Sequence, residues 1–295
     1  MVKEFLLGDN PFIGVSHLSQ EKAREESKIA LENKAKVIKA ALEGGATGFT
    51  FSTHPTNLKL LEYLRENEEN LLEEMNYYIL TPYAQAYVRK ANIMGTPALA
   101  KSILKNIMKH PSRILDLAIG TITLSPERFV ELFIETELTP YLKILPRKKV
   151  KAILLHETLT EFIIAFNLLD LTEYLDRTLR KNLKVGFGLE TRNAGLLKKW
   201  LYNSNYQPEY IMTPANPLGY QMAPSKEAAE KAINELGSKT KIIAINILAS
   251  GAINLTEAIK YLSKFKEAIY AVTSASTKPN RIRNNFVTLK TKLLS

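Results

Sequence analysis

The chain has 295 residues, of which 45% are apolar and 24% charged, and it contains no Cys. This composition is typical of globular proteins and excludes disordered, collagen-like and disulfide-stabilised classes. The lack of Cys also excludes thiolate nucleophiles and Cys-ligated metals, so any metal would need His, Asp or Glu ligands.

The net charge is +10, from 40 Lys and Arg against 30 Asp and Glu. The basic charge is local, because residues 268–295 contain five basic and no acidic side chains, whereas residues 62–74 are strongly acidic. No basic patch is interleaved with aromatic residues, which argues against nucleic acid and favours either a small anionic or phosphorylated partner or merely a basic surface. No apolar run approaches the ~20 residues of a membrane span, and residues 1–18 lack a signal-peptide core, so we expect a cytoplasmic protein without a membrane partner.

Short β-branched and apolar runs alternate with helical patterns along the whole chain, as in repeated strand–helix units. The pattern predicts eight strands, at residues 5–12, 48–53, 77–81, 151–156, 184–189, 210–213, 241–247 and 268–273. It predicts helices between them, among others at residues 34–42, 58–74, 226–236 and 256–265. Eight such units favour an α/β fold, an eight-stranded (β/α)8 TIM barrel, as a single domain over residues 1–295.

The third and fourth strands are separated by far more residues than a barrel helix and its loops need. We therefore expect a helical insertion within about residues 84–145, with helices at 98–108 and 126–137. The insertion leaves the carboxyl end of a strand, where barrels hold their active sites. A lid, an oligomer contact and an extra helix without a functional role all remain open for it.

Polar residues at the carboxyl ends of barrel strands converge on one mouth. Here they include His17, His54, His156, Asp9 and Glu190. The three His could bind a divalent metal, since imidazole and carboxylate ligands suit zinc, iron or manganese. Alternatively, His156 is a lone general acid or electrophile, or the His residues only brace loops.

The last two predicted strands are followed by residues typical of a phosphate site. Leu-Ala-Ser-Gly-Ala at 248–252 follows the seventh, and Ser274 to Thr277 follow the eighth and precede a basic segment with Arg281. Small residues let backbone N–H groups approach an anion, and a helix start and an Arg add positive charge. The alternative is that these Ser and Thr residues only cap the eighth helix.

Several of these segments resemble the aldo-keto reductase superfamily. KAILLHE at 151–157 is similar to its fourth strand, which ends in His, and YIMTPANPL at 210–218 to its sixth. ILASGA at 247–252 is similar to its seventh strand, and STKPNRIRNNF at 276–286 follows its Ser-x-x-x-x-Arg-Ile-x-x-Asn-Phe cofactor stretch. The resemblance covers roughly residues 150–286.

The resemblance implies that NADP is the cofactor. Ser276, Arg281 and Asn285 would face its adenosine phosphate, and Ser250 and Gly251 its pyrophosphate. Together with Ser274, these residues form the predicted cofactor site.

The catalytic end departs from the family, which uses an Asp after the second strand, a Tyr proton donor, a Lys on the third strand and a His on the fourth. Here Ser52 stands at or near the Asp, no Tyr occurs in residues 52–61, and Pro82 follows the third strand. His156 alone is kept. Tyr83 and Tyr87 could restore a donor if the insertion folds over the mouth.

Glu190 and Thr191 stand where the family binds the nicotinamide with Ser and Asn. We expect the Glu190 carboxylate either to pair with an imidazolium or to act as a base.

The leading hypothesis is an NADP-linked oxidoreductase, or a close relative, that acts on a small anionic metabolite through His156 and altered partners. A second is a lyase or hydrolase, with or without a metal, in which Asp9, His54, His156 and Glu190 are the catalytic groups. A third is a non-catalytic barrel that binds a ligand or partner through its insertion.

Overall fold

The computed structural model describes residues 2–15, 28–83 and 126–294, with residue 25 and scattered positions between 92 and 105. Eight parallel strands pair in chain order, and β8 pairs with β1 to close the barrel. This confirms the predicted (β/α)8 fold. The strands are β1 (Glu4–Gly8), β2 (Gly48–Ser52), β3 (Asn76–Thr81), β4 (Val150–Leu155), β5 (Gly186–Glu190), β6 (Tyr210–Pro214), β7 (Lys241–Ile245) and β8 (Ile269–Ser274).

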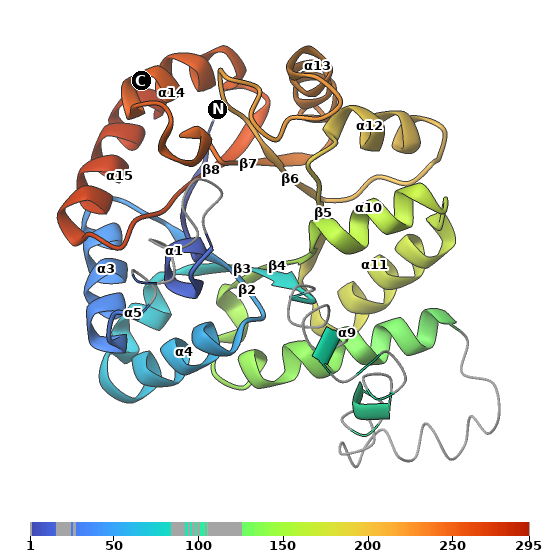
Figure 1. The fold of residues 1–295 in the computed structure, drawn as a ribbon, viewed down its shortest axis with the longest axis horizontal. Coiled ribbons are helices and arrows are strands. Elements are labelled where there is room, and N and C mark those ends of the chain that lie inside the picture. The colour runs from blue at the N-terminus through green and yellow to red at the C-terminus, as the bar shows by residue number, and fades with distance from the viewer. Residues whose placement is uncertain are drawn as a thin grey trace.

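The helices of the described ranges form a ring around the barrel, except the short α1, which lies inside the ring in Figure 1. They are α1 (Asn10–Ile13), α3 (Leu31–Glu43), α4 (Pro55–Asn67), α5 (Glu69–Glu74), α9 (Pro126–Leu142), α10 (Glu157–Ala165), α11 (Leu169–Leu183), α12 (Ala194–Tyr202), α13 (Lys226–Leu236), α14 (Leu255–Leu262) and α15 (Pro279–Leu294). Short 3₁₀ turns lie at Arg147–Lys149, Ala249–Gly251 and Ser263–Phe265. None of these helices has both the length and the apolar content needed to cross a membrane.

The apolar residues form two cores, because successive strand residues point to opposite faces of the sheet. Phe5 and Leu7 of β1 face the helices, whereas Leu6 between them faces the barrel axis. The axial core is closed by large side chains, including Tyr78 and Tyr210, which pack edge to face with ring centroids 5.7 Å apart. The barrel interior is therefore filled with side chains, and room for a ligand lies at its carboxyl end.

Two predicted boundaries are wrong because a backbone feature interrupts the apolar pattern. The first strand was expected to reach residue 12, but β1 ends at Gly8, and Pro11 lies in the first turn of α1. Pro has no N–H to donate to a sheet but suits the start of a helix. The predicted helix 58–74 is two helices, α4 and α5, which are separated at Glu68 with φ −146°.

The predicted insertion is shorter than expected. Residues 126–142 form α9, which contacts β3, α4 and α11 and therefore belongs to the ring of the barrel. Figure 1 shows α9 between α4 and α11. This leaves residues 84–125 as the part of the predicted range in which an insertion can lie. The predicted helix at 98–108 lies largely outside the described residues, so its role as a lid or oligomer contact stays a prediction.

Candidate functional site

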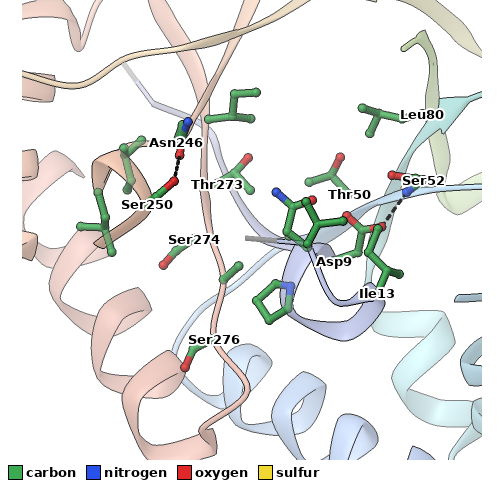
Figure 2. Close-up of a pocket in the computed structure, with 18 of the residues that line it drawn as sticks. Asp9, Ile13, Thr50, Ser52, Leu80, Asn246, Ser250, Thr273, Ser274 and Ser276 are labelled. Carbon is green, nitrogen blue, oxygen red and sulfur yellow. Dashed lines mark hydrogen bonds between the residues drawn. The ribbon is translucent and has the colours of Figure 1, made fainter. Parts of the chain in front are cut away.

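A cavity of about 520 Å³ opens at the carboxyl end of the barrel and extends to the start of α15. Most of the predicted site residues line it, although they come from distant parts of the chain. They are Asp9, His156, Glu190, Ser250, Gly251, Ser274, Ser276, Arg281 and Asn285. In Figure 2, Asp9, Thr50 and Ser52 lie on one side, with Ser250, Ser274 and Ser276 on the other.

Asp9 follows β1 and is buried at the wall of the cavity. Its Oδ2 accepts hydrogen bonds from the Ser52 N–H at 2.9 Å and from Asn57 Nδ2 at 2.7 Å. Burial raises the pKa of Asp9 from 3.8 to about 6, although both hydrogen bonds act in the opposite direction. A carboxyl group with this pKa exchanges protons near neutral pH.

The two described His residues of the predicted site are both helix N-caps. Nδ1 of His54 accepts from the Thr56 N–H at 3.1 Å, and Nδ1 of His156 accepts from the Thr158 N–H at 3.3 Å. In each ring, Nδ1 therefore stabilises the local backbone, as the loop-bracing interpretation predicts. His156 also lines the cavity, so its Nε2 is the atom that can meet a ligand.

His54 is not among the residues that line the cavity, contrary to its predicted catalytic position. Its ring instead packs edge-on against Tyr83, with centroids 4.7 Å apart. Tyr83 does line the cavity, whereas Tyr87, the other proposed proton donor, lies outside the described residues.

The metal hypothesis gains no support from the described part of the chain. Within it, no group of three or more His, Asp and Glu side chains is placed to hold a metal ion. The predicted set of His17, His54 and His156 stays a prediction, because His17 lies outside the described residues; of the other two, only His156 lines the cavity.

Glu190 ends β5 and is only 4% exposed. Its Oε2 accepts from the Glu157 N–H at 3.1 Å, and its Oε1 lies 3.5 Å from Nη2 of Arg192. Arg192 also pairs with the Glu157 carboxylate. The partner of Glu190 is thus a guanidinium and not the expected imidazolium. The sequence analysis missed Arg192, although a basic residue two positions beyond a strand-end Glu could have indicated the pair.

The turn after β7 has an unusual backbone. Asn246, Ala249 and Ser250 have φ values of 55°, 45° and 59°, and Gly251 follows at 93°. Each non-Gly residue in this left-handed region costs roughly 1–2 kcal/mol. A Cβ at Gly251 would meet nothing within 4 Å, so glycine is required there by conformation and not by space. Strain is thus concentrated in a turn at the cavity wall, where small residues expose the backbone.

The serines near α15 form local hydrogen bonds in the turn before the helix and with its side chains. Ser276 Oγ accepts from the Lys278 N–H at 3.1 Å, and Ser274 Oγ accepts from Asn285 Nδ2 at 3.2 Å. Arg281 lines the same part of the cavity and is exposed. Its guanidinium forms no salt bridge with the described residues, so it can pair with an anion.

The two ends of the cavity differ in how well they fit NADP. The strained turn at Ser250 and Gly251 and the guanidinium of Arg281 suit its phosphates. At the other end, Glu190 is paired with Arg192, and Thr191 Oγ1 donates to Glu161 Oε1 at 2.5 Å. These groups do not offer the neutral amide contacts that the resemblance implies for a nicotinamide. This part of the cavity therefore differs from the nicotinamide site of the family.

Comparisons with known proteins agree with this geometry at the level of the fold. No family model matches the sequence, and no curated protein matches it. A proposed aldo-keto reductase from Pseudomonas aeruginosa superposes with a TM-score of 0.63 at 13% identity, over 99% of this chain and 92% of that one.

Two further solved structures give the same result. An aldo-keto reductase from Bacillus halodurans, in its holo form, has a TM-score of 0.55 at 10% identity, over 99% of this chain and 91% of that one. One from Bombyx mori in complex with NADP has a TM-score of 0.51 at 11% identity, over 97% and 83%. The chain therefore has the TIM-barrel fold of the aldo-keto reductases.

Proposed function

We propose that the protein is an NADP-linked oxidoreductase that acts on a small anionic metabolite. The observation that carries the proposal is a single cavity lined by Arg281 and Ser250 together with His156 and Asp9. A dinucleotide needs phosphate-binding groups and a reactive centre in one site, because its phosphates and its reactive ring must be bound at the same time.

Arg281 would bind the 2′-phosphate of the adenosine, since a guanidinium matches phosphate geometry with paired donors. The backbone around Ser250 and Gly251 would approach the pyrophosphate, and the start of α15 adds the positive end of its dipole. The bound cofactor supplies a hydride. The Bombyx mori structure, which contains NADP, supports this choice of cofactor.

The anionic character of the metabolite is proposed from the basic groups at the cavity. Lys278 and Arg281 line one end, and Arg192 lines the other. Because Arg192 is already paired with Glu157 and Glu190, a substrate carboxylate or phosphate would have to compete for it. We continue to expect a cytoplasmic enzyme, and a role of residues 84–125 in oligomerisation remains a proposal.

Calorimetric titration with NADPH and NADH tests the cofactor assignment. Arg281→Ala should weaken NADPH binding about 10- to 100-fold, the value of a lost charged hydrogen bond, and should leave NADH nearly unchanged. Arg283→Ala is the matched control, because this residue lies on the same helix but points to Glu43, 3.9 Å away, and does not line the cavity. Equal weakening of both nucleotides, or no binding of either by the parent, would refute the assignment.

A further inference from the structure

The end of the cavity near β1 contains an acid that the family resemblance does not assign. We propose that Asp9 is the proton donor of the reaction, and that the cavity floor beside it, formed by β1, β2 and β8, is the subsite for a substrate carbonyl oxygen. This inference rests on the proposed function and adds the reacting group to it.

The hydrogen bonds of Asp9 define which of its oxygens can react. Both the Ser52 N–H and Asn57 Nδ2 donate to Oδ2. In a neutral carboxyl group the oxygen that accepts two donors is the carbonyl oxygen, so the proton resides on Oδ1. Asn57 is itself fully buried and also donates to the Ser52 carbonyl at 2.9 Å. The Ser52 hydroxyl also hydrogen-bonds the Asp9 carboxyl group and lowers its pKa, as the other donors do. The acid is therefore held in one orientation by donors from Ser52 and Asn57.

Burial favours the neutral form of Asp9 relative to an exposed carboxyl group, because no cation offsets it. Burial raises the pKa of Asp9 to about 6, and no ion pair of Asp9 exists among the described residues. The titratable or charged side chains that share the cavity are Tyr83, His156, Glu157, Glu190, Arg192, Lys278 and Arg281. From α9, Tyr141 faces Asp9 as well, and burial keeps that phenol neutral by raising its pKa.

Two hydroxyl groups beside Asp9 indicate that the floor is completed by a polar ligand. Thr50 pairs in register with Gly8, and a Cβ at Gly8 would lie 3.0 Å from the Thr273 methyl group, so both threonines adjoin Gly8, the residue before Asp9. Oγ1 of each is buried without a hydrogen-bond partner among the described residues, although each residue lines the cavity. Buried hydroxyls are normally paired, so an unpaired couple at a cavity wall points to a missing ligand.

NADPH, when bound, would supply a hydride to the carbonyl carbon, and the π electrons of the C=O bond would move to its oxygen. That oxygen takes the proton from Oδ1 of Asp9, which leaves an alcohol, NADP⁺ and an Asp9 carboxylate. Solvent reprotonates the carboxylate through the open end of the cavity. In the oxidation direction the carboxylate accepts the alcohol proton.

The test compares the parent protein with Asp9→Asn, which keeps the shape and the acceptor oxygen but has no acidic proton. Asp170→Asn, an exposed change on the outer helix α11, is the control. NADPH consumption is measured with small aldehydes, including the anionic 4-carboxybenzaldehyde. Asp9→Asn should lower kcat by about 100-fold or more, the usual value of general acid catalysis, with an unchanged Kd for NADPH. The kcat of the parent should fall above pH 6, whereas the residual kcat of Asp9→Asn should show no such decrease.

A second measurement does not depend on turnover. Carbon-13 NMR of Asp-labelled protein should show one carboxyl group that titrates near pH 6 and is absent from the Asp9→Asn spectrum, and thermal melting should confirm that the variant is folded. The proposal is overturned if kcat stays within about threefold of the parent, well below the effect of a lost acid. It is also overturned if no such carboxyl titrates, or if the parent binds NADPH but reduces none of the aldehydes. Failure to bind NADPH refutes the proposed function itself.

Discussion

The buried Asp9 makes a prediction about stability that requires no ligand. Its pKa rises from 3.8 to about 6 on folding, because burial disfavours the charged form. A shift of about 2 pH units corresponds to about 3 kcal/mol. The folded protein binds this proton more tightly than the unfolded chain does. The stabilisation is therefore complete below pH 4 and is lost as the pH rises through 6.

Asp9→Asn removes this titration and keeps an acceptor for Ser52 and Asn57. Unfolding by urea, followed by circular dichroism at several pH values, gives the free energy of unfolding of both proteins. The difference, parent minus variant, should fall by about 3 kcal/mol between pH 4 and pH 7. Other titrating groups occur in both proteins and cancel. A difference that is independent of pH, or that rises with pH, would show that Asp9 is not a desolvated acid.

Three further substitutions test separate parts of the structure. Asn57→Ala should lower the free energy of unfolding by about 2–4 kcal/mol in a urea titration, because it removes the donor to two buried acceptors. A loss below ~1 kcal/mol would contradict the hydrogen bonds of Asn57 to Asp9 and Ser52. Gly44→Ala places a Cβ 2.5 Å from the Arg283 carbonyl oxygen, so α3 and α15 must separate, and Tm should fall; an unchanged Tm would contradict this packing. Glu190→Gln should tighten NADPH binding in calorimetry, because a neutral amide replaces a carboxylate at the predicted nicotinamide end; weaker binding would mean that the pair with Arg192 organises the site.

The barrel could be predicted from the sequence because its strands are short apolar runs separated by helical patterns. The boundaries were less accurate where a single residue changes the backbone. Pro11 ends the first strand region early, and the left-handed Asn246 follows the last residue of β7, although the pattern continued to residue 247. In the same way, the sequence pattern assigned α9 to an insertion. Its contacts with β3, α4 and α11 show that it belongs to the ring, and such contacts cannot be read from the pattern.

The membership of the site was largely predictable, but the roles of its residues were not. Strand-end positions identified Asp9, His156 and Glu190, because all barrel strands end at one mouth. The environment of Asp9, however, depends on Ser52 and Asn57, which are 43 and 48 residues away. No local pattern reports such a contact.

The central claim is that the cavity binds NADP although its catalytic residues differ from those of the aldo-keto reductases. A crystal structure of the protein with bound NADPH tests this claim most directly. We predict the adenosine 2′-phosphate against Arg281, the pyrophosphate at Ser250 and Gly251, and the reactive carbon of the nicotinamide within reach of Asp9. An empty cavity at saturating NADPH, or a nucleotide bound on another face of the barrel, would contradict the account.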